Sequence, residues 1–140
     1  FSDLSSEKAT LVDNLEEISF IKKSHNKSIK INVKKLDNFF NYFKKQKIDF
    51  IKIDTEGYEL EVLKGAKRII KKHRPKYIQI EFNWHQLIQN QTIYNFSKIL
   101  KNYDVFRILP YNSGLEKVNP ARPENNIFHL SNFVFIRKDI

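Results

Sequence analysis

Near the middle of the chain the spacing of hydrophobic positions changes twice, which predicts a strand, a helix and a second strand in succession. Ile48–Ile53 is almost continuously apolar, as expected for a strand covered on both faces of a parallel sheet. Apolar positions then recur at helical spacing from about Tyr58 to Lys72, and Pro75 ends that helix. Lys76–Phe82 returns to strand-like spacing. We therefore predict two parallel neighbouring strands joined by a right-handed helical crossover.

Weaker patterns on either side of this unit predict the remaining elements. They are a half-exposed edge strand at 29–33, a helix begun by Asp37 with its phenylalanines facing inward, an amphipathic helix at 93–103 capped by Asn90 or Thr92, and strands at Val105–Leu109 and Asn132–Arg137. Pro110–Asn126 holds three of the four prolines and predicts an irregular loop, either a lid or acceptor-binding loop or a solvent-exposed excursion. Ser6–Ile18 is compatible with a helix or with irregular structure.

Acidic and amide side chains follow the two central strands where each strand ends. Asp54 ends the first strand, and Glu56 follows two residues later. Glu81 and Asn83 occupy the end of the second strand. Ligands of open α/β sheets bind beyond the carboxyl ends of the strands, so these four side chains should converge on one crevice. His85 lies a few residues further along and is suited to act as a base near neutral pH.

The run DFIKIDTEGYELEVLKGA, followed after one helix length by PKYIQIE, resembles the signature of the FkbM family of S-adenosylmethionine-dependent methyltransferases. The match joins an acidic strand end, a Glu-Gly turn, a helix and a second acidic strand end in fixed order. The resemblance implies a class I, Rossmann-like sheet that is mostly parallel. Its antiparallel last strand should lie beside Lys76–Phe82, leaving Val105–Leu109 outermost. It also implies S-adenosylmethionine as cofactor and a hydroxyl of a sugar, glycan or polyketide as acceptor.

The glycines limit how much of such a domain the resemblance covers. Class I methyltransferases bind their cofactor with a Gly-rich loop after the first strand, and Gly57, Gly65 and Gly114 do not form one. We therefore expect residues 1–140 to be a single, partial domain that lacks the first strands of the sheet. Ile48–Ile53 would then present an unpaired edge through which the chain could oligomerise. Gly65, in the middle of a helix, indicates close packing on the sheet.

Methyl transfer to a hydroxyl requires alignment of donor with acceptor and removal of the hydroxyl proton. The catalytic candidates are Asp54, Glu81 and His85. Asp54 is the first choice for the base or for orienting the acceptor, because it ends the central strand. A structural alternative for Asp54 is a helix cap that accepts hydrogen bonds from the backbone N–H groups of the turn.

The turn after the first strand is also where we expect the cofactor to bind. Asp54, Glu56 and Gly57 are the candidates, although Glu56 is explained more simply by its favourable interaction with the helix dipole. Gly57 fits a turn that needs a positive φ or has no room for a side chain. A divalent cation, if one binds, would use Asp54, Glu81 and Asn83, by fold-level analogy with catechol O-methyltransferases.

Composition narrows the class of protein. A hydrophobic content of 41% indicates a globular domain, and the absence of cysteine excludes disulfides and thiolate metal sites. No apolar run has the length of a membrane span, so a cytoplasmic location is expected. The net charge of +9 would favour nucleic acid, an acidic glycan or a membrane surface, but lysines scattered in pairs are more simply solvated helix faces. We expect a small-molecule or glycan acceptor and no specific nucleic acid.

Two other classes of protein fit parts of the pattern. A metal-dependent nuclease or phosphohydrolase also uses carboxylates at adjacent strand ends. Restriction-type nucleases require a Lys two residues after the second acid, and Asn83 occupies that place. A non-catalytic interaction module that binds through an open sheet edge is the other alternative.

Overall fold

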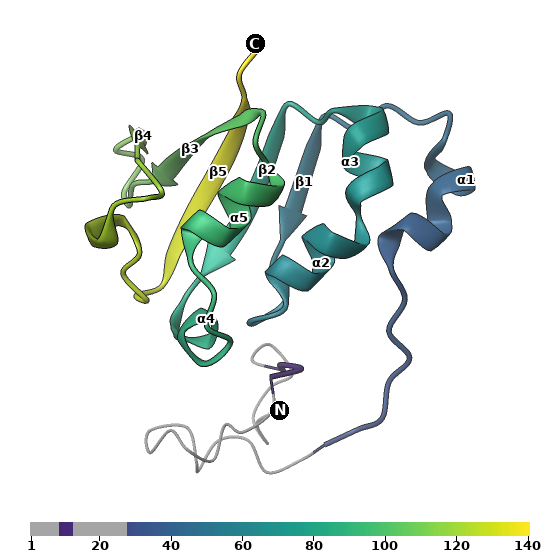
Figure 1. The fold of residues 1–140 in the computed structure, drawn as a ribbon, viewed down its shortest axis with the longest axis horizontal. Coiled ribbons are helices and arrows are strands. Elements are labelled where there is room, and N and C mark those ends of the chain that lie inside the picture. Colours follow the sequence, from purple (N-terminus) through teal and green to yellow (C-terminus); the bar gives the residue numbers. More distant parts are fainter. Residues whose placement is uncertain (1–8, 13–27) are drawn as a thin grey trace.

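The computed structural model describes residues 9–12 and 28–140. The described residues form a five-stranded mixed sheet in the order β1-β2-β5-β3-β4 (Figure 1). The strands are β1 (Phe50–Ile53), β2 (Tyr77–Phe82), β3 (Tyr103–Ile108), β4 (Leu115–Lys117) and β5 (Ser131–Arg137). The helices are η2 (Leu36–Phe39), α1 (Phe40–Phe43), α2 (Glu59–Gly65), α3 (Lys67–His73), α4 (Trp84–Ile88), α5 (Ile93–Ile99) and η3 (Pro123–Asn125), of which η2 and η3 are 3₁₀ helices.

The predicted central unit is confirmed, because β1 and β2 are parallel neighbours. The antiparallel last strand beside β2 is also confirmed. The expectation of a mostly parallel sheet is wrong for the described strands, since only the β1–β2 pair is parallel. The reason is that β5 lies between β2 and β3, so that one reversed strand makes two antiparallel pairs. β4 adds a third such pair, and β4 rather than β3 is therefore the outermost strand.

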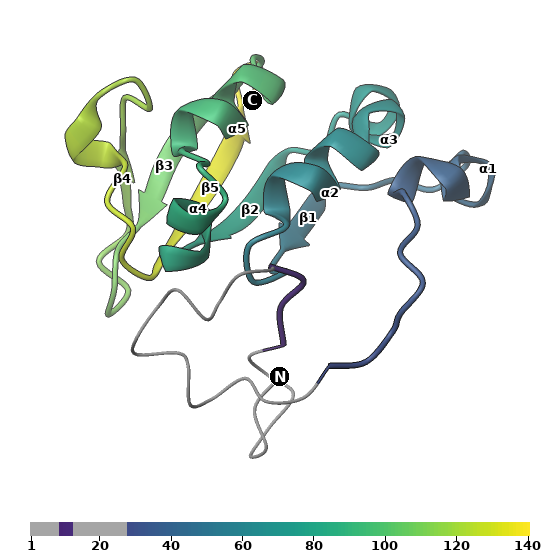
Figure 2. The ribbon, with the colours of Figure 1, turned by 60° about the horizontal axis from the view of Figure 1, so that its bottom comes forward.

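Helices α2 to α5 lie on one face of the sheet (Figure 2). Alternate residues of β2, such as Ile78 and Ile80, are fully buried on that face. On the other face Phe50 is 52% exposed and Tyr77 is 40% exposed. The expectation that the first strand is covered on both faces is therefore wrong for the described part of the chain, where β1 is also an edge strand.

A cluster of phenylalanine rings holds the carboxyl end of β2 in place. Phe82, the last residue of β2, is fully buried and its ring packs edge-on against Phe96 and Phe133. Its ring also stacks on Phe128, with centroids 5.4 Å apart. Burial of one such side chain is worth about 1.5–3 kcal/mol. The strand end that carries Glu81 is thus fixed by the core of the domain.

The helix predicted from Tyr58 to Lys72 is divided into α2 and α3. The helix breaks at Ala66, whose φ of −116° and ψ of 11° are not helical. The carboxylate of Asp37 accepts hydrogen bonds from the backbone N–H groups of Arg68 and Ile69, both at 3.0 Å. Asp37 therefore caps α3, 31 residues away, and not the helix that follows it in sequence.

The close approach predicted from Gly65 also has a different partner. A Cβ atom at Gly65 would lie 3.4 Å from the Cβ of Lys35 and 3.5 Å from its Cα. Gly65 thus packs against the extended segment before η2 and not against the sheet. The cost of a glycine inside a helix is offset by this approach of α2 to the chain at Lys35.

Three weaker predictions are wrong. Residues 29–33 form no strand and expose their apolar side chains, with Ile29 at 67%. The phenylalanines after Asp37 are not buried in the core, since Phe39 is 44% exposed and Phe40 and Phe43 are only partly buried. The segment 110–126 is not wholly irregular, because it contains β4 and η3.

The predicted cap of the later amphipathic helix is confirmed. The Thr92 hydroxyl accepts a hydrogen bond from the backbone N–H of Asn95 at the start of α5. The helix considered for Ser6–Ile18 falls outside the described residues except for 9–12, which are not helical. Within the described segments, no helix has both the length and the hydrophobicity to cross a membrane.

Candidate active site

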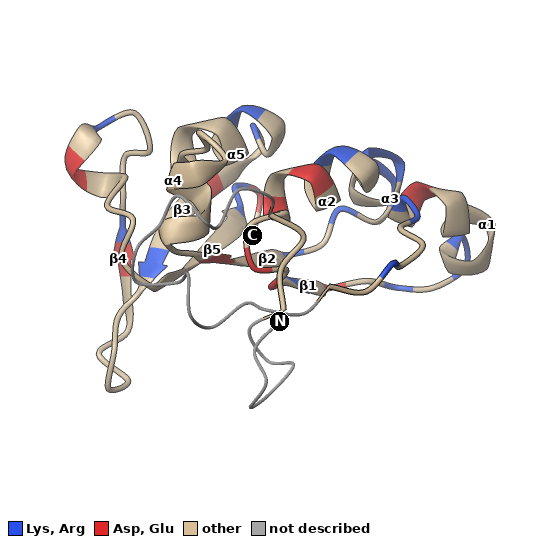
Figure 3. Cartoon of the chain, turned by 90° about the horizontal axis from the view of Figure 1, so that it is seen from below, with Lys and Arg blue, Asp and Glu red and all other residues tan. Residues whose placement is uncertain are grey.

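Three carboxylates meet at the edge of the sheet where β1 and β2 end. Asp54 directly follows β1, Glu56 lies in the next turn and Glu81 is the penultimate residue of β2. Each offers an oxygen atom, and these oxygens lie within 4.8 Å of one another. Acidic residues mark the ends of both strands and the start of α2 (Figure 3). Parallel pairing of β1 with β2 brings the three side chains together, as the strand-end pattern predicts.

Asn83 joins this group in a different role. Its side-chain Oδ1 accepts a hydrogen bond from the backbone N–H of His85 at 2.9 Å and so caps α4. Its Nδ2 donates to Glu56 Oε2 and to Glu81 Oε1, each at 3.2 Å. The Gln86 side chain accepts from the Asn83 N–H and completes the capping box. Asn83 thus orients two of the carboxylates and presents its amide N–H groups to them.

The surroundings of Glu81 perturb its carboxyl group. Partial burial raises the pKa of Glu81, and the neighbouring negative charges of Asp54 and Glu56 raise it further. The hydrogen bond from Asn83 and the charge of Lys52 oppose this shift. Burial and the neighbouring negative charges therefore favour proton uptake by Glu81.

Asp54 is paired with a cation. Its Oδ2 lies 2.8 Å from Lys52 Nζ, and its side chain remains 33% exposed. The hydrogen bond and the charge of Asp54 raise the pKa of Lys52. The backbone N–H groups of Thr55 and Gly57 in the turn that follows donate to Glu59, so the structure does not support the alternative of Asp54 as the cap.

His85 lies inside the site. Its side chain is 4% exposed, and its Nδ1 lies 3.2 Å from Glu56 Oε2 and 2.7 Å from Asn83 Oδ1. Its ring also stacks on Trp84, with centroids 3.5 Å apart. His85 is therefore held against Glu56 by the first turn of α4.

Glu59 is a functional residue that the sequence pattern did not single out. This carboxylate is 1% exposed and accepts hydrogen bonds from the Thr55 N–H at 2.8 Å and from the Gly57 N–H at 3.1 Å. It also accepts from the Thr55 hydroxyl and from Gln86 Nε2. Glu59 thereby fixes the turn that carries Glu56. The signal for this role is a carboxylate one helical turn after Thr55, which is in reach of the turn's free N–H groups.

Gly57 is required by the shape of this turn. Its φ is +110°, and a Cβ atom there would lie 2.5 Å from Val12 Cγ2 and 2.8 Å from His85 Cβ. The Thr10 hydroxyl donates to the carbonyl oxygen of Glu56. Residues 9–12 therefore pack directly on the turn, and both reasons given for Gly57, the positive φ and the lack of space, are confirmed.

An α/β sheet with acidic side chains at the carboxyl ends of parallel strands is typical of proteins that bind their ligands at that edge. The family profile described as "Methyltransferase FkbM domain" matches residues 2–110, which include the whole site. The chain therefore belongs to the FkbM methyltransferase family, and membership implies S-adenosylmethionine as the methyl donor. Neither the curated proteins nor the solved structures contained a match to the chain. The family match favours the methyltransferase interpretation over the nuclease and the non-catalytic module.

Proposed function

We propose that this domain catalyses S-adenosylmethionine-dependent O-methylation of a hydroxyl group on a sugar, glycan or polyketide. The observation that carries the proposal is the cluster of Asp54, Glu56 and Glu81 at the carboxyl ends of β1 and β2, with oxygens within 4.8 Å. It combines a turn able to contact a cofactor with a carboxyl group whose pKa is raised. Both are needed to align a hydroxyl and remove its proton.

The residues of the turn fit the proposed cofactor chemically. S-adenosylmethionine supplies an electrophilic methyl group on a positively charged sulfonium. Carboxylates such as Asp54 and Glu56 offset positive charge and accept charge-assisted hydrogen bonds from hydroxyl and ammonium groups. Gly57 contributes through its positive φ of +110°, since the space where its side chain would lie is filled by Val12 and His85. These three residues are our candidates for holding the cofactor.

Glu81 is our candidate for the general base. A raised pKa brings its carboxylate nearer to the basicity that proton transfer near neutral pH requires. In this role a Glu81 oxygen takes up the hydroxyl proton of the acceptor. Asp54, held by Lys52, orients the acceptor, and His85 acts on the site through its contact with Glu56.

The geometry alters the metal set expected from the sequence. The Oδ1 of Asn83 is occupied by His85, so Asp54, Glu56 and Glu81 are the oxygen donors that a divalent cation would use. A cation there would hold Glu81 in its ionised form and turn it from a base into a ligand. If a metal takes part, EDTA abolishes methylation and Mg²⁺ restores it. If Glu81 acts as a base without metal, EDTA has no effect.

The experiment that tests the proposal starts with cofactor binding. Calorimetric titration with S-adenosylhomocysteine should show saturable binding that Asp54→Asn and Glu56→Gln weaken. Glu61→Gln is the matched control, because Glu61 lies on α2 with its side chain 49% exposed and paired with Lys64. Equal binding by all four proteins would refute the assignment of the turn.

Transfer itself is followed with a radiolabelled methyl group and a panel of sugar, glycan and polyketide hydroxyl acceptors. Glu81→Gln should bind S-adenosylhomocysteine normally yet lose transfer. Glu61→Gln should retain methyl transfer. Full transfer by Glu81→Gln would remove Glu81 from the proposed mechanism, and label found on nitrogen or carbon atoms would contradict O-methylation.

A further inference from the structure

Two grooves lie at the end of the sheet opposite to the acidic site. The larger, of about 670 Å³, lies between α3 and α5 and reaches the start of β3 and the end of β5. The smaller, of about 320 Å³, lies on the other side of α5, next to β4. They share Lys98, Lys101 and Tyr103. Six residues of β2 separate this end from the acidic site, which is a distance on the order of 20 Å.

The lining of the larger groove is strongly basic. Among the residues that the structure describes, its lining contains no carboxylate and six cationic side chains, namely Lys67, Lys71, Arg74, Lys98, Lys101 and Arg137. Asp139, just outside the lining, pairs with two of these residues, Arg74 and Arg137. The other four are exposed lysines. The floor between them is apolar and includes Ile70, Ile99 and Leu100.

The smaller groove extends the same charge around α5. It adds Lys117 and Lys138, and its lining has one carboxylate, Asp104, which lies 2.8 Å from Lys117 Nζ. The two grooves together form a basic band that crosses the C-terminal end of α5. Cations near the C-terminus of a helix also interact favourably with the helix dipole. This interaction explains only the cations within the last turn of α3 or α5, and not the rest of the band. A small anion would occupy one groove, whereas an elongated polyanion would use the band on both sides of α5.

The aromatic residues of the band do not suit nucleic acid. Non-specific binding of single strands uses exposed aromatic rings on which bases stack. In the band, Tyr94 is covered by Lys98, whose Nζ lies 4.5 Å from the ring centroid. Tyr103 is 8% exposed and donates its hydroxyl to the carbonyl of Pro75. Tyr94 is 40% exposed but is the one exposed ring among the described residues of the band, whereas strand binding uses successive rings.

The helix between the grooves does not suit a membrane surface. Interfacial helices insert an exposed apolar face between the headgroups. The apolar residues Ile93 and Phe96 of α5 are fully buried in the core of the domain. The cations moreover border concave grooves, of which the larger has an apolar floor. Such a mixture suits a chain that alternates anionic groups with the C–H faces of sugar rings.

We propose that this basic band binds a linear acidic glycan. Carboxylate or sulfate groups of the glycan pair with the lysines at the rims of both grooves, and sugar rings lie over the apolar floor of the larger groove. The band is distant from the acidic site and its binding does not depend on methyl transfer. It would hold a glycan chain at the far end of the sheet from the strand ends where we propose the chemistry.

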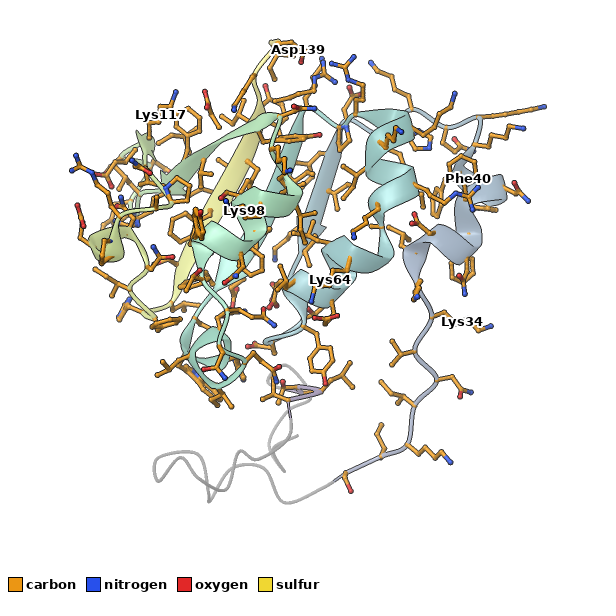
Figure 4. The ribbon with its side chains drawn as sticks, viewed as in Figure 1. Lys34, Phe40, Lys64, Lys98, Lys117 and Asp139 are labelled. Atoms are coloured by element: carbon orange, nitrogen blue, oxygen red, sulfur yellow. The ribbon has the colours of Figure 1, made fainter. Side chains whose placement is uncertain are left out.

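The test measures binding of a fluorescent heparin-derived oligosaccharide to the unmodified chain by anisotropy, without cofactor. Lys98→Gln/Lys101→Gln removes two charges shared by both grooves and should weaken binding roughly two- to thirtyfold, as expected for two exposed ion pairs. Lys30→Gln/Lys34→Gln is the matched control on the extended segment. Figure 4 shows Lys34 on this segment, separated from Lys98 and Lys117 by the helices α2 and α3. The control should leave affinity unchanged.

A second pair of substitutions guards against a folding defect in α5. Lys67→Gln/Lys71→Gln on α3 should weaken binding by a similar factor, with an unchanged circular dichroism spectrum. Equal weakening by the control pair would show that only net charge matters and would overturn the proposal. Tighter binding of a single-stranded oligonucleotide of equal charge, or of phosphatidylserine vesicles, would overturn the choice of a glycan.

Discussion

Replacement of Glu59 by glutamine changes one oxygen of a buried carboxylate into an NH₂ group with little change in shape. That carboxylate accepts hydrogen bonds from the N–H groups of Thr55 and Gly57, from the Thr55 hydroxyl and from Gln86 Nε2. An amide at this place can satisfy some of these donors through its remaining oxygen. Its NH₂ group then faces another donor, either a backbone N–H or the amide of Gln86. At least one donor is left without an acceptor in a buried place.

The size of the effect follows from these bonds. Hydrogen bonds to a charged group are worth about 1.5–3 kcal/mol each, and a buried donor left unsatisfied costs about 1–3 kcal/mol. Removing the buried charge of Glu59 recovers some desolvation energy and offsets part of this loss. We expect Glu59→Gln to lower the free energy of unfolding by about 2–4 kcal/mol, out of the roughly 5–15 kcal/mol typical of a domain.

The assay is urea unfolding followed by far-ultraviolet circular dichroism. Glu61→Gln is the control, since Glu61 lies two residues away on the same helix, is exposed and makes a surface ion pair with Lys64 at 2.6 Å. That change should stay within about 0.5 kcal/mol. If Glu59→Gln shifts the midpoint no more than Glu61→Gln does, Glu59 does not hold the turn and the reasoning is refuted.

Three further outcomes test other parts of the structure. Gly57→Ala should lower the free energy of unfolding in urea by about 1–3 kcal/mol more than Gly114→Ala. Both glycines have a positive φ, but of the two only Gly57 lacks space for a Cβ. Equal losses would contradict the close packing on the turn. Glu81→Gln should match the parent in stability below pH 4.5, the ordinary pKa of a glutamate side chain, and become the more stable protein as pH rises. The reason is that the folded state raises the pKa of Glu81, so that stability is lost when Glu81 ionises. Parallel curves of stability against pH would contradict this. Asp37→Ala should cost about 1 kcal/mol and Asp37→Asn much less, since asparagine also caps α3; equal losses would argue against the cap.

The parts of the fold that could be predicted are those encoded in local spacing. The run at Ile48–Ile53, the helical period after it and the run ending at Phe82 each depend on neighbouring residues only. The break at Ala66 could not be predicted, because it is stabilised by Asp37, far away in sequence. The segment 29–33 alternates like a strand, but alternation does not show whether a partner strand exists. β4 depends on the turn at Gly114, where the chain folds back on β3. In that turn the N–H group of Leu109 donates a hydrogen bond to the carbonyl oxygen of Gly114.

The site divides in the same way. Asp54 and Glu81 could be located because strand ends can be identified from the sequence and parallel neighbours end at the same edge. The spacing from Thr55 indicates that Glu59 can cap the turn, but its burial and its contact with Gln86, 27 residues further along the chain, could not be predicted. The sequence indicates Asn83 only as an oxygen ligand for a divalent cation. Its actual hydrogen-bond partners can be identified only once α4 is placed beside the turn.

These contacts make the acidic cluster dependent on α4. Glu59 accepts a hydrogen bond from the N–H group of Gly57 in the turn and another from the side chain of Gln86. The side chain of Gln86 accepts one from the backbone N–H group of Asn83. Asn83 in turn donates to Glu56 and Glu81, one from each strand end. Three carboxylates within 4.8 Å repel one another, and charges so close separate unless neighbouring groups hold them. The buried amides of α4 supply that restraint, so the capping box of a short helix both terminates β2 and sets the spacing of the carboxylates that we assign to catalysis.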